Sequence, residues 1–400
     1  MADKPARICI VGGGFGGLFT ALGLAGAGEV TLISSEEHFT HTPLLYEYLS
    51  GEVEAWHIAP HYRELLDNRV RFIHGAVTDI DFDAREVSIA GRLRRLAYDI
   101  LVVAVGGVTN FWGIEGAEQH AMPFRKIRHA DDLRQRMIET LDHIPPDTAP
   151  QDARSHATFV VVGAGASGVE LATKMSDLLH DAFARRGLRG EPRVMILEMG
   201  RAVVPGMDAD IREVVIHALH EKRVELHTET RVVRVLPRGV VFEHNGQQTE
   251  LEAAAVVWVA GVRVNPLVER LDLEKNERGQ IIVEPTLQVR GRREVLALGD
   301  VAYFRDVVPS LAGTAQLAFQ QSDLAVRNVQ AIIDGGVPSR RHFEELGEAV
   351  SLGTESAAVL AAGRVMEGQL ARQARFALYT TRLPTWQHRL RVGTSWFFGG

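Results

Sequence analysis

Residues 8–17, ICIVGGGFGG, place a run of apolar residues suited to a buried strand directly before the glycine pattern G-x-G-x-x-G. The glycines are Gly12, Gly14 and Gly17, and a plausible helix follows them. In such a unit the first glycine makes a tight turn, the second lets the backbone approach a pyrophosphate, and the third packs the helix on the strand. The helix N-terminus then faces the phosphates with its partial positive charge. The stretch therefore predicts a dinucleotide-binding unit.

The chain contains this unit twice. FVVVGAGASG at 159–168 repeats the spacing at Gly163, Gly165 and Gly168, and VVAVGGV (102–108) is matched later by VVWVAGV (256–262). Short alternating runs, typical of antiparallel strands, lie between these landmarks in each half. The repeat predicts an α/β fold: two Rossmann-like dinucleotide-binding domains with β-meander inserts, followed by a C-terminal membrane-associating segment.

Composition excludes several classes of protein. The chain has 400 residues, is 46% hydrophobic and 24% charged, and carries a net charge of −7, which argues against nucleic acid as a partner. Its single cysteine, Cys9, excludes disulfides and a redox-active cysteine pair within one chain. His57 and His61 flank Pro60 with no carboxylate to complete a ligand set, so we expect no metal site.

Acidic residues after the second strand of each unit indicate which nucleotide binds. Glu198 ends the run RVMILE, where a carboxylate accepts from a ribose 2′-hydroxyl and repels a 2′-phosphate, favouring NADH. Arg201 lies close by, so use of NADPH stays open. In the first half Ser34 occupies the corresponding position, and Glu36 is the displaced candidate for the ribose contact.

Two dinucleotide sites in one chain indicate a hydride relay from a nicotinamide to a flavin. The run REVLALGD reads as a further buried strand that ends in Gly299 and Asp300. An acid there can accept hydrogen bonds from the ribityl hydroxyls of a flavin. Alternatively, Asp300 serves only as an ordinary cap of the loop. A helix over 313–333 would aim its N-terminus at the reduced flavin and stabilise the negative charge that builds there.

Six motifs in order, VGGGFGG, PLLYEYLSG (43–51), VVGAGASGVELA, VVWVAGV, LALGD and AQLAFQQ, make the chain resemble the type II NADH:quinone oxidoreductases, which are flavoproteins with two dinucleotide-binding domains. The run PLLYEYLSGEVEAWHIAP is most similar to the cyanobacterial and plastid branch, which reduces demethylphylloquinone and plastoquinone. The resemblance implies FAD and NADH as cofactors. It assigns FAD to Gly12, Gly14, Gly17, Gly299 and Asp300, and NADH to Gly163, Gly165, Gly168, Glu198 and Gly261. Glu36 and Ala315 are further candidates at the FAD site, where Ser34 replaces the family's usual acid.

The same resemblance implies three residues at the reacting groups. Glu170 would orient the nicotinamide or relay a proton, and the alternative is a plain helix-surface glutamate. Gln316 and Gln320 are four residues apart and so share a helix face, where neutral amides can bind quinone carbonyls. By resemblance they line the quinone pocket, with Tyr46 as a further candidate.

These features predict electron transfer from NADH through FAD to a membrane quinone without proton pumping. Two alternatives remain: a soluble reductase of a ferredoxin-like protein, and a flavin- and NADH-binding redox sensor without catalytic function. Disulfide reductases and sulfide:quinone reductases of this architecture need catalytic cysteines that one Cys9 cannot supply. The sequence leaves open whether the chain forms a homodimer.

The chain closes on a basic, aromatic tail without carboxylate side chains, including Arg375, Arg389, Arg391 and Trp386, with Pro384 expected to divide it into two helices. Interfacial helices carry Arg on one face and aromatic residues on the other, which predicts a peripheral protein on the cytoplasmic side of a bacterial inner membrane. The alternative is a pair of helices docked on the protein body. The expected domains are 1–118 with 263–335 for FAD, 119–262 for NADH, and 336–400 as a C-terminal hairpin and membrane-docking region.

Overall fold

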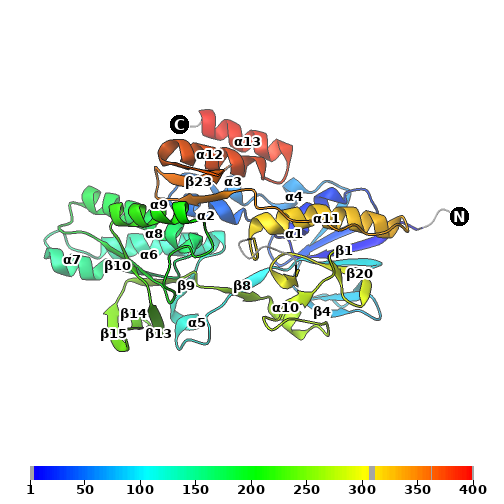
Figure 1. The fold of residues 1–400 in the computed structure, drawn as a ribbon, viewed down its shortest axis with the longest axis horizontal. Coiled ribbons are helices and arrows are strands. Elements are labelled where there is room, and N and C mark those ends of the chain that lie inside the picture. Colours follow the sequence, from blue (N-terminus) through cyan, green and yellow to red (C-terminus); the bar gives the residue numbers. More distant parts are fainter. Residues whose placement is uncertain (1–3, 306–310, 362, 399–400) are drawn as a thin grey trace.

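The computed structural model describes residues 4–305, 311–361 and 363–398. Figure 1 shows two lobes side by side, each built around a parallel sheet, with the C-terminal helices packed above them. The lobes follow the two halves of the internal repeat, and each sheet is covered by helices.

The first lobe contains a six-stranded sheet in which every neighbouring pair is parallel except the outermost, β19 with β20. Its strands are, in spatial order, β19 (Gln288–Val289), β20 (Arg292–Ala297), β7 (Ile100–Val103), β1 (Arg7–Val11), β2 (Glu29–Ser34) and β3 (Val70–His74). Helices α1 (Phe15–Gly23) and α11 (Ala315–Ile333) run together along one face of this sheet (Figure 1). The central strands are buried on both faces, which explains their continuous apolar sequences.

The second lobe contains a five-stranded, wholly parallel sheet. Its strands are, in order, β12 (Val224–His227), β11 (Arg193–Leu197), β10 (Thr158–Val162), β16 (Ala255–Trp258) and β9 (Met122–Pro123). Its helices are α6 (Ile127–Asp142), α7 (Pro150–His156), α8 (Ala166–Arg186) and α9 (Ala209–Glu221). The glycine turns lead directly into α1 and α8, as the two fingerprints predict.

Each lobe carries the predicted antiparallel meander. The first is β4 (Val77–Asp81), β5 (Glu86–Ile89) and β6 (Leu96–Ala97); the second is β13 (Thr230–Leu236), β14 (Gly239–His244) and β15 (Gln247–Glu252). The antiparallel pair β8 (Gly107–Thr109) and β17 (Val262–Val264) connects the lobes. The predicted α/β class with two Rossmann-like domains and meander inserts is confirmed.

The C-terminal region forms a three-stranded antiparallel sheet and two helices. These are β22 (Glu348–Ser351), β23 (Ala357–Ala361), β24 (Arg364–Glu367), α12 (Gly368–Thr381) and α13 (Trp386–Phe398). The helices are separated around Pro384, because proline cannot continue the preceding helix. In the described parts of the chain, no helix combines the length and apolar character needed to cross a membrane.

Short elements complete the fold. They are η1 (Thr42–Leu44), α2 (Leu45–Leu49), α3 (Ala55–Ile58), α4 (Tyr62–Leu65), α5 (Ala117–His120), α10 (Pro266–Arg270), β18 (Ile281–Ile282), η2 (Gly299–Val301) and β21 (Ala302–Tyr303). The segment η1–α2 contacts α6 and α8 of the second lobe, so the first half of the chain reaches across to the second site. The predicted domain limits remain a prediction.

Candidate functional site

A cavity of about 520 Å³ opens in the first lobe at the carboxyl ends of its parallel strands. This edge is where ligands bind in open α/β sheets. The first glycine turn, the end of β2, the η2 segment and the N-terminus of α11 all contribute to the lining. Among the predicted FAD residues the lining includes Gly14, Glu36, Gly299, Asp300 and Ala315.

The geometry of the first glycine turn fits a bound pyrophosphate. Gly12 has a φ of +106°, and a Cβ atom there would lie 2.3 Å from the Ala104 carbonyl oxygen. A Cβ on Gly17 would lie 1.8 Å from the Gly12 carbonyl oxygen, so only glycine lets α1 start this close to β1. A Cβ on Gly14 meets nothing within 4 Å, which leaves the backbone open toward the cavity. The tight turn at Gly12 and the close packing at Gly17 are as the spacing predicts, and the contact of Gly14 with a pyrophosphate remains a prediction that this open backbone fits.

The end of β2 differs from the usual acidic arrangement. Ser34 is buried, and Tyr62 fills the space beside it by donating its hydroxyl to the Gly13 carbonyl oxygen at 2.6 Å. A Cβ on Gly13 would lie 2.0 Å from the Tyr62 hydroxyl and 2.9 Å from the Ser34 Oγ, so these two side chains pack closely against the glycine turn. Glu36 lines the cavity instead and forms an ion pair with Lys126. Tyr62 and Lys126 were not anticipated, because both are distant from Ser34 in the sequence.

The opposite wall combines Asp300 with the start of α11. Burial raises the pKa of the Asp300 carboxyl, while Arg125, 3.7 Å away, opposes the shift. Thr314 caps α11 by accepting from the Leu317 amide at 3.1 Å, so the helix begins at the cavity. Gln321 on α11 accepts from the Gly299 amide at 2.7 Å and fixes the turn that carries Asp300. Gln321 belongs to the AQLAFQQ motif quoted above. Assigning the buried face of that helix from the sequence could therefore have identified Gln321 as a residue that faces the fold.

The second glycine turn repeats the first. Gly163 has a φ of +108°, a Cβ on Gly168 would lie 1.9 Å from the Gly163 carbonyl oxygen, and a Cβ on Gly165 meets nothing within 4 Å. Glu198 accepts from the Ala164 amide at 2.7 Å and from the Gly200 amide at 2.6 Å, which fixes its carboxylate beside the turn. The turn therefore offers the same open backbone to a second pyrophosphate.

Gly261 follows the last strand of the second sheet and has a φ of +93°. A Cβ there would come within 2.9 Å of the Trp112 ring, whose indole N–H donates to the Ala260 carbonyl oxygen at 2.9 Å. The close approach of this indole requires glycine at position 261.

Glu170 is not a surface residue. It is only 6% exposed, and it accepts from the Ser351 amide at 2.9 Å and from the Arg375 guanidinium at 2.8 Å. Burial raises the pKa of Glu170 to about 7, because desolvation of the carboxylate outweighs the attraction of Arg375. Arg375 also pairs with Glu47, whose pKa is lowered because the charges of Arg375 and Lys174 outweigh the desolvation of its carboxylate.

A buried ion-pair network thus connects three parts of the chain. Glu47 and Glu52 come from the α2 region, Lys174 from α8, and Arg372 and Arg375 from α12. Arg372 contacts Glu52 at 2.8 Å, and Lys174 pairs with both glutamates. The network ties the C-terminal helix to the helix that follows the second glycine turn.

A second, small pocket of about 40 Å³ adjoins the first cavity, with which it shares Phe15 and Ala315. Gln316 lines it, and its contact with a quinone remains a prediction. Gln320 lies elsewhere: it donates to the Glu344 carbonyl oxygen at 2.8 Å and accepts from the Glu344 amide at 3.1 Å. That pairing uses the Gln320 amide to anchor the chain after α11, and its role at a quinone remains a prediction that this geometry does not support. Tyr46 is buried and stacks on Phe124, with ring centroids 5.5 Å apart.

Residues 6–322 match the family described as pyridine nucleotide-disulphide oxidoreductase. The chain is 35% identical to demethylphylloquinone reductase of Synechocystis, covering 99% of this chain and 96% of that protein. It is 30% identical to the type II NADH:quinone oxidoreductase NdhA of Mycobacterium tuberculosis, covering 98% and 86%. The chain belongs to the type II NADH:quinone oxidoreductases. NDH2 of Plasmodium falciparum, solved in complex with RYL-552, shares the fold with a TM-score of 0.86 over 99% of each chain, at 17% identity.

The tail of this type II oxidoreductase packs differently from the expectation. Arg375 was expected on a membrane-facing polar surface, and this is wrong: it is 2% exposed and bound to Glu47 and Glu170. Two carboxylates far away in the sequence offset the cost of desolvating the guanidinium. His388 and Val392, four residues apart on α13, are also buried, so α13 is docked on the body through one face.

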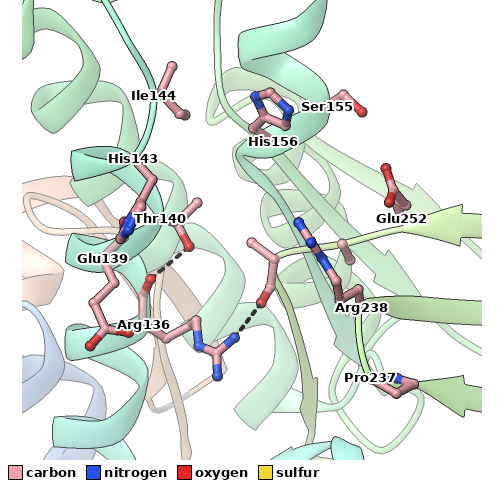
Figure 2. Close-up of a pocket in the computed structure, with 12 residues that line it drawn as sticks. Arg136, Glu139, Thr140, His143, Ile144, Ser155, His156, Pro237, Arg238 and Glu252 are labelled. Atoms are coloured by element: carbon pink, nitrogen blue, oxygen red, sulfur yellow. Dashed lines mark hydrogen bonds between the residues drawn. The ribbon is translucent and has the colours of Figure 1, made fainter.

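A further hollow of about 450 Å³ lies on the second lobe of this oxidoreductase, away from the glycine turns (Figure 2). Figure 2 shows Arg136 of α6, whose guanidinium donates to the Ala254 carbonyl oxygen at 3.4 Å in the link between β15 and β16. No predicted site residue lines this hollow. Within the ranges that the structure describes, no cluster of three or more His, Cys, Asp or Glu side chains could hold a metal ion.

Proposed function

We propose that this chain transfers electrons from NADH through FAD to a membrane quinone, using the residues that line its two adjoining pockets. Family membership confirms the predicted reaction and both cofactors. The observation that carries the residue-level proposal is the shared wall of Phe15 and Ala315: an acceptor held beside Gln316 adjoins the flavin cavity directly.

When bound, FAD accepts a hydride from NADH and passes electrons on to the quinone. The open backbone at Gly14 holds the FAD pyrophosphate, and the open backbone at Gly165 holds that of NADH. Asp300 accepts from ribityl hydroxyls, and Glu36 is the candidate for the ribose. The N-terminus of α11, beginning at Ala315, stabilises negative charge on the reduced ring.

Glu170 is proposed to orient the nicotinamide or to hold a proton near it. Its pKa of about 7 keeps the carboxyl divided between protonated and ionised forms at neutral pH, which suits a proton-relaying group. Glu170→Gln should slow flavin reduction by NADH in stopped flow. An unchanged rate would assign the residue to the ion-pair network alone.

Glu198 is proposed to select NADH over NADPH. Its carboxylate is fixed beside the second glycine turn, where it would accept from a ribose hydroxyl and repel a 2′-phosphate. Arg201 is highly exposed and forms an ion pair with Glu229 at 3.0 Å. This ion pair engages the guanidinium that could otherwise attract the 2′-phosphate of NADPH.

The outer face of α13 is proposed to contact the membrane. Trp386 and Leu390 are 68% and 59% exposed, lie four residues apart and so share a helix face, with Arg391 exposed beside Leu390. Because the quinone is dissolved in lipid, the enzyme must contact a membrane to reach it. The proposed location is the cytoplasmic side of a bacterial inner membrane. A homodimer remains a prediction that light scattering would test.

Membrane contact can be tested without removing the tail, whose buried face supports the fold. The double variant Trp386→Ser with Leu390→Ser should bind anionic liposomes more weakly, while NADH oxidation with ferricyanide stays at the wild-type level. Leu93→Ser is the matched control, because Leu93 is fully exposed on the distant first meander. Undiminished liposome binding by the double variant would contradict the proposed surface.

The reaction itself is tested by separating its two halves. The FAD-loaded chain is mixed anaerobically with NADH, and the loss of flavin absorbance is followed. Addition of a short-chain quinone should then restore the absorbance within the turnover time. Rapid reduction that no quinone reverses would contradict the proposed function.

A further inference from the structure

The pocket of about 40 Å³ beside the flavin cavity contains a histidine that has no place in the known sequence motifs. Its lining consists of Phe15, His41, Pro43, Ala315, Gln316, Phe319, Leu346, Tyr379 and Arg382. Four of these residues are aromatic or imidazole rings, so the walls suit a flat ring with a polar edge.

His41 is held rigidly at this pocket. Its amide donates to the Ile58 carbonyl oxygen at 2.7 Å, and its carbonyl oxygen accepts from the Leu44 amide at 3.1 Å. The imidazole packs edge-on against Phe15, with ring centroids 5.3 Å apart, and against Tyr379 at 5.8 Å. These contacts fix the position of the ring in the wall of the pocket.

Neither nitrogen of the His41 ring has a hydrogen-bond partner within the described residues, although the residue is 0% exposed. The buried Nε2 of Gln316, which lines the same pocket, likewise lacks a partner in the described parts of the chain. Buried polar side-chain atoms are nearly always paired in folded proteins, because each unpaired group costs free energy. Two such groups at one cavity point to a polar ligand that pairs with both.

The charge state of His41 restricts the chemistry of that ligand. Burial lowers the pKa of His41 to about 3, and the positive charges of Arg382 and Arg375 act in the same direction. A neutral imidazole offers one N–H donor and one acceptor nitrogen, and the Gln316 amide nitrogen offers donors. An uncharged oxygen that accepts as a carbonyl and donates as a hydroxyl matches this set in both of its redox forms.

We propose that His41 and Gln316 together bind a carbonyl oxygen of the quinone, which makes His41 a quinone-binding residue of this enzyme. The assignment rests on the proposed function, since it names a ligand contact for the quinone of that reaction. The pocket has room for the oxygen-bearing edge of a ring, and its shared wall with the flavin cavity places that edge next to the cofactor. The competing occupant is a water molecule that bridges His41 and Gln316.

The experiment compares the full-length, FAD-loaded wild type with His41→Phe and His41→Asn. Phenylalanine preserves a flat ring among aromatic neighbours and removes both nitrogens, whereas asparagine retains a donor and an acceptor. Loss of one neutral hydrogen bond lowers kcat/KM for menadione and for a short-chain ubiquinone about fivefold to tenfold in His41→Phe. The Asn variant should recover part of this loss. His217→Phe on the exposed face of α9 is the control.

Two reference measurements separate binding from folding. Flavin reduction by NADH precedes quinone binding and reports on the NADH side. The thermal midpoint should not fall in His41→Phe, because the histidine side chain makes no hydrogen bond to any described residue and phenylalanine keeps a flat ring in its place. A lower thermal midpoint with equal losses in both half-reactions would overturn the assignment in favour of a structural role. Unchanged quinone kinetics in His41→Phe would overturn it in favour of bridging water. Failure of the wild type to reduce either quinone would contradict the proposed function as well.

Discussion

Replacing Glu170 by Gln should change how the stability of the protein depends on pH. The carboxyl is buried between Arg375 and the Ser351 amide, and its pKa is raised from 4.5 to about 7. Glutamine has nearly the same shape and cannot ionise. The variant therefore removes the titration and leaves the packing of the site largely intact.

The sign follows from proton binding. Between pH 4.5 and about 7 the folded state holds a proton on Glu170 that the unfolded chain has released, so the free energy of unfolding falls as the pH rises through this range. For these two pKa values the loss between pH 5 and pH 8 is about 2.5 kcal/mol. Glu170→Gln should abolish this contribution, making the variant more stable relative to wild type at pH 8 than at pH 5 by a similar amount.

Denaturant unfolding of the FAD-loaded proteins, without NADH, at pH 5 and pH 8 measures this difference. Glu252→Gln, at an exposed position on the second meander, is the control and should follow the wild-type profile. If Glu170→Gln and the wild type show parallel pH profiles, the raised pKa and its assigned cause are both refuted.

Three other variants test the ion-pair network and the two nucleotide sites. Arg375→Met leaves Glu47 and Glu170 without their shared partner and should lower the free energy of unfolding by about 3–5 kcal/mol, measured in denaturant; a loss under about 1 kcal/mol would show the network to be replaceable. Gly14→Val places a side chain where the backbone is open to the cavity and should lower the flavin-to-protein ratio of the purified protein at least tenfold, whereas full flavin content would contradict the pyrophosphate assignment. Glu198→Ala should raise KM for NADH by about one to two orders of magnitude and reduce the preference for NADH over NADPH, since a lost hydrogen bond to an anion is worth about 1.5–3 kcal/mol; an unchanged KM would exclude the ribose contact.

Local patterns in the sequence predicted much of the fold. The glycine turns were predictable because all three glycines act within one strand, turn and helix, where spacing alone determines the backbone approach. The break between α12 and α13 followed from Pro384 for the same reason. Such features depend on neighbours in the sequence, and these are visible without a structure.

Features that depend on distant partners were not predictable. Gln316 and Gln320 share a helix face, yet Gln316 lines the small pocket and Gln320 binds the backbone of Glu344. Only the course of the chain around Glu344 determines this difference. Arg375 resembled a membrane-binding arginine until Glu47 and Glu170, 328 and 205 residues away, appeared beside it. Burial of a charge is decided by partners that composition and periodicity do not reveal.

This chain passes electrons from NADH to a quinone. The most direct test of this reaction is steady-state NADH oxidation by the purified, FAD-loaded protein, with a short-chain quinone or a ferredoxin as the acceptor and NADPH assayed in parallel. We predict rapid turnover with the quinone, a lower rate with NADPH, and none with ferredoxin. Fast ferredoxin reduction without quinone reduction, or negligible turnover with every acceptor, would contradict it.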